Sequence, residues 1–409
     1  MSEFSPRPLW TGRTLALLGI VLVAANLRTA VAALSPIVSQ ISTDIPLTAT
    51  SIGLLGMLPP VCFAVFGIFT PVFTRRLGLE NVLVLALTAM LIGHLTRGGA
   101  GFLTALMIGS VITFAGLGVG NVLLPPLVKK YFPDRVGLIT SLYVTVVSLS
   151  TLIPPLIAVP VADAAGWRVS LGLWVLPVVV ALVPWLTMFV RHRVQASPGA
   201  LVEEAEPALL GRIWRSSIAW ALAVVFAASS LNAYAMFAWL PQLLIDTAGV
   251  TPAQAGTLLS VYAAMGIPCA LLIPWLTSRM KNVAILVYLG VAAFLIGDLG
   301  LLLAPGTLTW LWVVLAGLGP LFFPLTLVLI NLRTRTHAGS VALSGFVQSV
   351  GYTLGALGPL CVALLHEITG AWTAPLLFLI GTALAITVAG AVVARPHLLE
   401  DDLERRHRS

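Results

Sequence analysis

The chain has 409 residues, of which 59% are hydrophobic and only 9% are charged. A soluble domain carries about 25% charged residues, so this composition excludes a water-soluble globular protein and indicates a protein that crosses a bilayer many times. The net charge of +7 is also found in nucleic-acid-binding proteins, but here the positions of the basic residues explain it as a signal of membrane topology.

Apolar runs of about twenty residues are long enough to cross the hydrocarbon core of a bilayer as helices. Twelve such runs occur in the sequence, six before and six after a polar stretch. We expect spans at 14–38, 50–73, 80–97, 101–128, 136–161, 169–190, 217–245, 254–278, 282–303, 308–332, 340–365 and 374–394.

The polar stretch at 191–216 contains several Glu and Arg residues and separates two halves with equal numbers of spans. We therefore predict an all-α membrane protein with twelve transmembrane helices in two six-helix pseudo-symmetric bundles. The bundles are expected at 1–190 and 217–395, with a cytoplasmic linker at 191–216 and a cytoplasmic tail at 396–409.

Basic residues are concentrated on one side of this topology. Lys and Arg favour the cytoplasmic side of membrane proteins. If both termini are cytoplasmic, 19 of the 22 Lys and Arg residues fall in cytoplasmic segments, and Arg97 and Arg168 fall outside. The pattern predicts a multi-pass protein of a bacterial-type inner (plasma) membrane with both termini in the cytoplasm.

Short similar sequences recur in the two halves at a nearly constant spacing. The segment Pro71-Val-Phe-Thr-Arg-Arg76 resembles Pro274-Trp-Leu-Thr-Ser-Arg279, and Trp167 corresponds to Trp372. Because the matches keep the same order and spacing, they indicate duplication of a six-helix unit, as in transporters built from parallel repeats.

Arg28 is the one remaining basic residue, and it lies in the middle of the first predicted span. A central arginine costs about 2.5–3.5 kcal/mol on insertion scales, and its guanidinium keeps its proton. Asp298 is an acidic residue within a predicted span, but we expect it to reach the membrane interface rather than to neutralise Arg28. Arg28 is therefore predicted to face a polar or anionic ligand. The alternative is a structural arginine bonded to helix carbonyls.

The sequence shows none of the patterns of a membrane enzyme. It contains no His-Glu-x-x-His motif, no paired embedded carboxylates and no Cys/His cluster. Cys62, Cys269 and Cys361 are far apart in apolar segments and are interpreted as packing residues. We expect no enzymatic activity, no metal site and no cofactor.

Six plus six spans around a central linker resemble the major facilitator superfamily. The Gly166-Trp167-Arg168 opening of the sixth span fits that superfamily, whereas its usual loop signature between the second and third spans is degenerate. There Arg76 and Gly78 remain, but Pro71 and Arg75 replace the usual Gly and Asp. The resemblance implies the major facilitator fold.

A narrower resemblance extends over nearly the whole chain. The sequence is similar to the cyanate-permease and nitroimidazole-transporter family at Leu27-Arg28, 120–125 with Lys129, 239–241, 253–256 and 342–352. That family has members assigned to unlike small molecules, so the resemblance implies transport of a small solute without naming it.

The superfamily fold implies that the first, fourth, seventh and tenth spans surround a central cavity. Asn121 lies midway along the fourth span, and Asn26 corresponds to Asn232 and Arg28 to Tyr234 in the repeat. We predict that these side chains line the cavity and contact substrate. Interhelical hydrogen bonding is the alternative for each Asn.

Polar side chains in the eleventh span recur on one helix face. Ser344, Gln348 and Tyr352 are spaced i, i+4 and i+8, and we predict that they orient a ligand, with a bundle-facing polar seam as the alternative. Further candidates for the cavity are, in sequence order, Tyr143, Ser148, Trp239 and Tyr262. Trp239 is equally suited to an aromatic packing or interfacial role.

Basic residues near span ends favour an ordinary explanation. Lys129, Lys130, Arg333 and Arg335 end the fourth and tenth spans on the predicted cytoplasmic side, where cations suit helix C-termini. An inner gate that attracts anions is the alternative. His94 and His337 lie near span ends and are expected to be solvated rather than to relay protons.

These features predict a secondary transporter that moves a small anionic or polar solute, cyanate-like or a small organic anion, by alternating access with Arg28 at the central site. The coupling partner is predicted to be a counter-anion (antiport) or a proton (symport). The rival hypothesis is efflux of nitroimidazole-like or other small aromatic drugs, with Tyr234, Trp239 and Tyr352 stacking on them. The expected partners are a small-molecule substrate and the lipid bilayer, with no nucleic acid, and the chain is expected to be a monomer.

Overall fold

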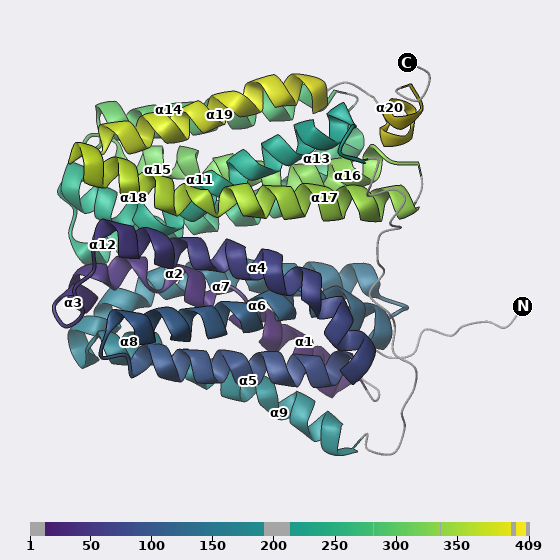
Figure 1. Cartoon of the computed structure of the whole chain (residues 1–409), viewed down its shortest axis with the longest axis horizontal. Coiled ribbons are helices and arrows are strands. Elements are labelled where there is room, and N and C mark those ends of the chain that lie inside the picture. Colours follow the sequence, from purple (N-terminus) through teal and green to yellow (C-terminus); the bar gives the residue numbers. More distant parts are fainter. Residues whose placement is uncertain (1–12, 192–212, 281, 336, 394–397, 406–409) are drawn as a thin grey trace, which may run out of the picture.

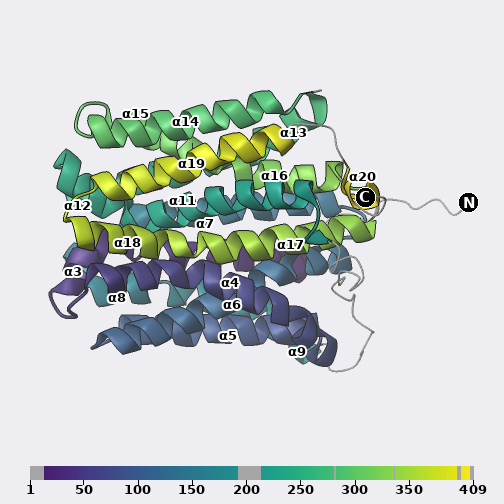
Figure 2. The same ribbon diagram turned by 45° about the horizontal axis from the view of Figure 1, so that its top comes forward.

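The computed structural model describes residues 13–191, 213–280, 282–335, 337–393 and 398–405. Every regular element in these ranges is a helix, and the long helices run side by side along one axis (Figures 1 and 2). Twelve helical segments are long and apolar enough to cross a membrane. The predicted all-helical, twelve-span architecture is therefore confirmed.

Six membrane-spanning segments form the N-terminal half, which is coloured purple to blue in Figure 1. The first is broken into four pieces and the sixth into two. The elements are α1 (Thr14–Asn26), α2 (Thr29–Ala32), η1 (Ser35–Ile37), α3 (Val38–Ser42), α4 (Ala49–Leu77), α5 (Leu79–Gly98), α6 (Leu103–Tyr131), α7 (Val136–Ala165), α8 (Trp167–Gly172) and α9 (Val175–Arg191).

Six further spans form the C-terminal half, and three of them are broken near the middle. The elements are α11 (Ser217–Ala248), α12 (Pro252–Ala264), α13 (Gly266–Arg279), α14 (Ala284–Leu303), α15 (Thr309–Leu318), η2 (Gly319–Leu321), α16 (Phe322–Leu332), α17 (His337–Gly355), α18 (Leu357–Thr369), α19 (Thr373–Val393) and a short terminal helix, α20 (Leu399–Arg405).

The observed spans agree with the predicted ranges. The first span continues to Ser42 rather than ending at 38, because a 3-10 turn at Ser35–Ile37 carries the chain past Pro36. The predicted linker at 191–216 lies almost wholly outside the described residues.

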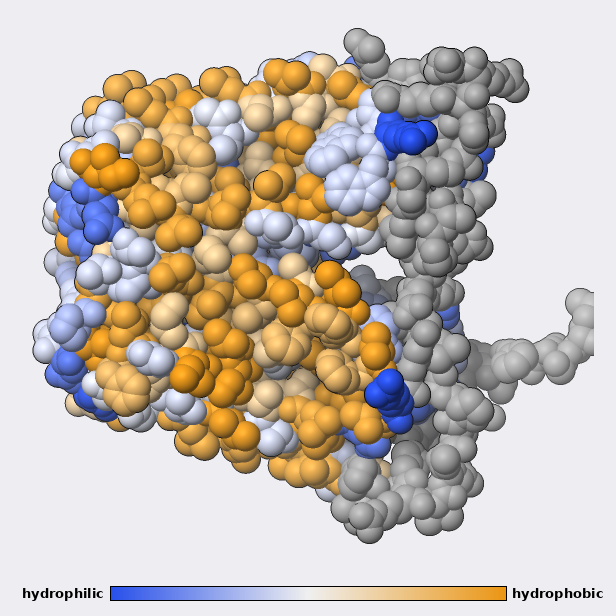
Figure 3. All heavy atoms as spheres, in the orientation of Figure 1, coloured by the Kyte–Doolittle hydropathy of each residue, from blue (hydrophilic) through white to orange (hydrophobic). Residues whose placement is uncertain are grey.

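The two halves lie side by side, each around its own apolar core. Apolar side chains cover the flanks of the molecule, and hydrophilic residues gather toward its two ends (Figure 3). We name these ends after the short helices that lie there. The α3 end carries α3 and the loop after it, and the α20 end carries α20 and the start of α11, where Asp402 accepts hydrogen bonds from Ser216 Oγ and Ser217 N at 2.7 Å each.

The same side-chain contact occurs in both halves at the α3 end. Trp167 Nε1 donates to Asp44 Oδ2 at 3.0 Å, and Trp372 Nε1 donates to Asp246 Oδ2 at 2.9 Å. Arg168 adds a hydrogen bond to Asp44, which lowers the pKa of that exposed carboxyl below its ordinary value. A repeated Asp–Trp contact is what duplication of a six-helix unit predicts.

Small residues close the two halves together at the α3 end. A Cβ atom placed on Gly56 of α4 would lie 2.7 Å from Ala238 Cβ of α11, and one on Gly256 of α12 would lie 2.5 Å from Pro155 O of α7. Ser35 Oγ also donates to Phe237 O across the halves at 2.6 Å. Backbones approach this closely only where side chains are small.

The halves separate toward the α20 end. Figure 3 shows the surface hollowed between them there. Three turns further along α4 than Gly56, a Cβ atom on Gly67 would meet nothing nearer than Val122 Cγ2 at 3.8 Å, in the same half. The structure is therefore sealed at the α3 end and open toward the α20 end.

Gly56→Ala should loosen the seal at the α3 end, because the new methyl group overlaps Ala238 of the other half. We expect a cysteine substituted for Ser35, in a background without other cysteines, to react faster with a hydrophilic thiol reagent. Gly67→Ala is the matched control on the same helix and should gain up to about 1 kcal/mol of stability from helix propensity without changing the reactivity. Equal labelling in the two variants would contradict the seal.

Candidate functional site

Arg28 occupies a break in the first membrane span. The span runs from Thr14 to Ser42, so Arg28 lies at its midpoint. Its backbone (φ −127°, ψ −5°) is not helical and forms the N-cap of α2, directly after α1 ends. Breaks of this kind are tolerated within a membrane where protein or cavity water satisfies the freed backbone groups, so the break itself indicates a polar interior.

The Arg28 side chain is held by aromatic groups from both halves. Its Cζ atom lies 5.2 Å from the centroid of the Phe63 ring of α4. Its guanidinium interacts with the hydroxyl groups of Tyr234 of α11 and Tyr352 of α17. A single cation of the N-terminal half therefore contacts two tyrosines of the C-terminal half.

Aromatic packing fixes the positions of these tyrosines. The Tyr352 ring meets the Phe226 ring edge-on, with centroids 5.1 Å apart and an interplanar angle of 89°. Tyr234 is 9% exposed, whereas Arg28 and Tyr352 are half-buried. The arginine is therefore accessible from the space between the halves.

Within the described residues, Arg28 has no carboxylate partner. Among the described residues, the ion pairs that involve Arg or Lys do not include Arg28. Phenol oxygens and an aromatic face stabilise a cation partly, by about 0.5–2 kcal/mol for the cation–π contact. The site therefore presents an uncompensated positive charge with fork-like donors, which suits a small anion or a nitro group.

The structure gives Asn26 and Asn232 equivalent places away from this charge. Both are fully buried. Asn26 Nδ2 donates to Leu22 O at 2.8 Å and to Pro177 O of α9 at 3.1 Å, while Asn232 Nδ2 donates to Ala228 O at 3.0 Å and to Thr382 Oγ1 of α19 at 2.7 Å. This arrangement favours interhelical hydrogen bonding over cavity lining for the pair.

Asn121, Ser344 and Gln348 lie half-buried on the helices that flank the site. Asn121 Nδ2 donates to Leu117 O of its own helix at 2.9 Å, and Gln348 Nε2 donates to Ser344 Oγ at 2.8 Å. A Cβ atom on Gly120 would lie 2.9 Å from Leu27 Cδ2, so this turn of α6 packs beside the break that holds Arg28. All three remain candidates for substrate contact.

The remaining aromatic candidates have packing partners. Tyr143 packs against the N-terminal core. Trp239 Nε1 donates to the Pro359 carbonyl of α18 at 2.9 Å, which favours a structural role. The Tyr262 ring meets Phe237 edge-on at 5.6 Å, and its buried hydroxyl has no hydrogen-bond partner within the described ranges. Ser148 is half-buried and donates to Val144 O of its own helix at 3.1 Å.

Three of the four basic residues near the ends of α6 and α16 have local partners, as the ordinary explanation expects. Lys130 Nζ lies 2.6 Å from Glu80 Oε1, Arg335 lies 2.8 Å from Asp401 of α20, and an Arg333 nitrogen donates to Val393 O at 3.1 Å. Lys129 is exposed.

One expectation about α5 is wrong. His94 was expected to be solvated, but its side chain is 0% exposed, and Arg97 in the last turn of the same helix is 1% exposed. The reason is the packing of small residues around the end of α5. A Cβ atom on Gly109 of α6 would lie 2.9 Å from Arg97 N, and one on Gly98 would lie 3.0 Å from Gly172 of α8. Helices this close cover side chains that the sequence places near a helix end. The other histidine, His337, has its side chain outside the described residues.

Asp298 is likewise fully buried rather than at the interface, and its two carboxyl oxygens have no hydrogen-bond partner in the described structure. A Cβ atom on the preceding Gly297 would lie 2.5 Å from Ala316 N of α15. This close approach of α14 and α15 removes Asp298 from solvent. Asp298 lies 204 residues after His94, so both halves bury a titratable group at this repeat position.

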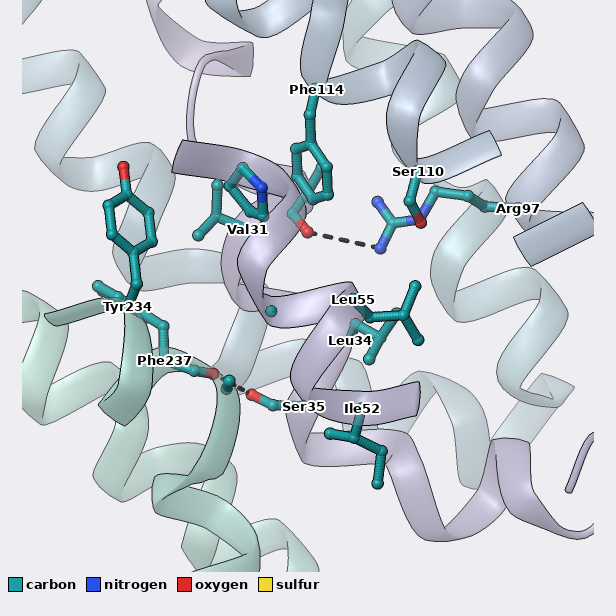
Figure 4. A pocket seen from close by; sticks show the side chains of 14 residues that line it. Val31, Leu34, Ser35, Ile52, Leu55, Arg97, Ser110, Phe114, Tyr234 and Phe237 are labelled. Atoms are coloured by element: carbon teal, nitrogen blue, oxygen red, sulfur yellow. Dashed lines mark hydrogen bonds between the residues drawn. The ribbon is translucent and has the colours of Figure 1, made fainter. Parts of the chain in front are cut away.

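A small cavity of about 30 Å³ lies between the halves (Figure 4), and its lining from the first span, Ala30 to Ser35, follows Arg28 toward the α3 end. Arg97, Ser110 and Phe114 line it from the N-terminal half, and Tyr234 and Phe237 line it from the C-terminal half. Tyr234 thus belongs both to the cavity and to the Arg28 site. Sequence reasoning found Tyr234 from the repeat but missed Arg97 and Ser110, because nothing in their local sequence marks their burial.

Comparison with known proteins identifies the family. Residues 17–356 match the Major Facilitator Superfamily. The chain belongs to this superfamily. An uncharacterized transporter of Bacillus subtilis, YycB, is 33% identical over 95% of this chain and 96% of its own length, and the 2-nitroimidazole transporter of Escherichia coli is 30% identical over 94% and 96%. The cyanate transport protein CynX of Escherichia coli is 26% identical over 93% of this chain and 98% of its own.

Solved structures agree on the fold. A bacterial homologue of the human lysosomal transporter Spinster, described as inward-facing and occupied, superimposes with a TM-score of 0.74 at 15% identity, covering 95% of this chain and 98% of that one. The expected superfamily and its narrower cyanate and nitroimidazole branch are therefore confirmed, and the chain is a multi-pass membrane transporter rather than an enzyme.

Asp298→Asn should leave the stability of the transporter unchanged or raise it. An ionised carboxylate without donors is costly to bury, and asparagine keeps the shape without the charge. The apparent melting temperature in detergent measures this. Asp246→Asn is the matched control and should lower it, because Trp372 Nε1 donates to that carboxylate and such a bond contributes about 1 kcal/mol. A large drop in melting temperature for Asp298→Asn alone would contradict the prediction, because it would mean that the Asp298 carboxylate has a stabilising partner.

Proposed function

We propose that this superfamily member is a secondary active transporter that moves a small anionic or polar solute by alternating access, with Arg28 at the central site. The observation that carries the proposal is the mid-span position of Arg28, where an uncompensated guanidinium faces two tyrosines of the opposite half. The named activities of the cyanate and nitroimidazole relatives support a small solute with anion-like oxygen or nitrogen atoms.

The mechanism follows from differential binding. A guanidinium without an anionic partner in the membrane interior is unstable, and an anion bound to it offsets part of that cost. Because Tyr234 and Tyr352 belong to the other half, a substrate that bridges Arg28 and a tyrosine draws the two halves together. A ligand that binds the closed arrangement more tightly shifts the equilibrium toward it, which permits opening on the opposite side.

The orientation in the membrane is part of the proposal. Most described basic residues at the ends of spans lie at the α20 end, including Lys129, Lys130 and Arg279. We assign that end to the cytoplasm, in keeping with the positive-inside rule. The structure then corresponds to an inward-open state, the state named for the Spinster homologue. The site is complete within one chain, so a monomer is the proposed functional unit.

The proposed coupling is exchange of one anion for another or co-transport of a proton with the anion. Within the described structure no carboxylate contacts Arg28, so the substrate itself supplies the negative charge. Return of an empty, positively charged site through the closed state is unfavourable for the same reason, and this favours exchange.

Arg28→Gln should greatly reduce the stabilisation of purified protein by small anions. At a ligand concentration of about 100 times Kd, wild type gains roughly 2.7 kcal/mol, and most of this gain should disappear with the guanidinium. The measurement is the apparent melting temperature with cyanate and nitrite. Arg279→Gln is the matched control, since its Cζ also lies over an aromatic ring, at 4.5 Å from Trp275, but its side chain is exposed. An unchanged anion response in Arg28→Gln would falsify the assignment of the site.

Efflux of a small nitroaromatic drug is the second candidate, favoured by the three aromatic rings of Phe63, Tyr234 and Tyr352 around Arg28. Tyr352→Leu should then weaken 2-nitroimidazole transport in proteoliposomes much more than cyanate transport. The stacking of a flat heteroaromatic ring on an aromatic side chain contributes about 1–3 kcal/mol to binding, and cyanate has no ring. Equal losses for the two solutes would argue that the ring serves only to hold Arg28.

A further inference from the structure

Arg97 is a second arginine buried in the protein interior, and no carboxylate of the described residues forms an ion pair with it. It is 1% exposed, and its Nε and Nη1 atoms have no hydrogen-bond partner in the described structure. Nη2 makes one long hydrogen bond, at 3.5 Å, to the Ala30 carbonyl, and Cζ lies 5.7 Å from the Phe114 ring centroid. A structural arginine is held by several acceptors, so these contacts leave most of its donors unused.

The unused donors face the cavity between the halves. Figure 4 shows the Arg97 guanidinium directed into it, beside Ser110 and Phe114. Ser110 is fully buried, and its hydroxyl also lacks a hydrogen-bond partner in the described structure. Most of the other lining residues are apolar. Two unsatisfied polar side chains thus converge on one side of a mainly apolar space.

The cavity restricts what can occupy it. Its volume of about 30 Å³ accommodates roughly two water molecules, which favours a small ion over a larger organic molecule. A permanently charged guanidinium requires a negative partner when it is desolvated, and a bent or linear triatomic anion can accept from Arg97 and Ser110 together.

We propose that Arg97 and Ser110 form a second binding site for a small monovalent anion, on the α3 side of the central site. This inference rests on the proposed function in its class of ligand, since the same anions are assigned to Arg28. The sites are adjacent, because Tyr234 lines the cavity and interacts with Arg28, and Ala30, which accepts from Arg97, lies two residues after Arg28.

The location defines a role in the transport cycle. Gly56 and Phe237 also line the cavity, and they belong to the contacts that seal the α3 end. An anion that enters at that end meets Arg97 before Arg28, and an anion that leaves there meets Arg97 after Arg28. The second site thereby lowers the cost of moving a charge between the sealed end and the centre.

Nitrite titrations of the purified full-length protein test the site. The variants are Arg28→Gln, Arg97→Gln and the double variant, and the readout is the nitrite-dependent rise in apparent melting temperature. We expect Arg28→Gln to keep a reduced rise and the double variant to lose it. In the Arg28→Gln background, Ser110→Ala should raise the half-saturating nitrite concentration by about 2- to 10-fold. Benzoate is larger than these anions, so the rise in melting temperature that it causes should be the same in Arg97→Gln and in wild type.

The outcomes separate the two proposals. A nitrite response that is smaller than wild type in Arg28→Gln, or absent from it, and no smaller in the double variant would overturn the Arg97 site while leaving Arg28 in place. A wild-type response in Arg28→Gln that disappears in Arg97→Gln would support the Arg97 site and reject Arg28. A complete lack of response in wild type overturns both.

Stability without anions provides a second measurement. Arg97→Gln should melt at the same or a higher temperature than wild type, because a ligand-binding cation is unsatisfied when empty. Arg168→Gln is the control and should melt no higher than wild type, since Arg168 is paired with Asp44. A lower melting temperature for Arg97→Gln, with an unchanged nitrite response, would identify Arg97 as a structural residue and overturn the proposal.

Discussion

A guanidinium in the middle of a membrane span has to be solvated by something other than lipid, and the arrangement of this transporter follows from how it meets that requirement. Arg28 lies where α1 ends and α2 begins, so the helix break and the charge occur together. Phe63 supplies a ring face from the same half, and Tyr234 and Tyr352 supply phenol oxygens from the other. These contacts reduce the cost of the charge without cancelling it.

The contact across the two halves gives the arginine a mechanical consequence. A cation whose interaction partners all lie in its own half has no influence on the separation of the two halves. Arg28 is satisfied partly by the opposite half, so its free energy depends on their separation. At the α3 end the halves meet through Gly56 and Gly256, whose missing side chains allow the helices of the two halves to approach closely. A weak seal of small residues and a charge-dependent contact at the centre together describe an equilibrium that a bound anion can shift.

Several features followed from sequence because they depend on local chemistry or composition. The spans followed from apolar run length, since every backbone group in lipid must be bonded within its helix. The repeat related Arg28 to Tyr234 and Asn26 to Asn232, whereas the contact between Arg28 and Tyr234 is visible only in the structure. For the asparagines, the sequence showed that the two positions are equivalent but not where their side chains point, because a position along a helix does not reveal which neighbouring helix it faces. Their bonds to α9 and α19 depend on packing.

The sequence by itself determined that this is a twelve-span, duplicated membrane transporter with a permanent charge at mid-membrane, because run length, charge bias and residue identity need no knowledge of neighbours. Only the tertiary structure decided which polar groups are buried. Arg97, His94 and Asp298 lie within or near span ends that composition alone assigns to solvent, yet glycines at 98, 109 and 297 bring adjacent helices close enough to cover them. Burial is a property of the packed helices, and the distance between two helices is set by small residues far apart in the chain.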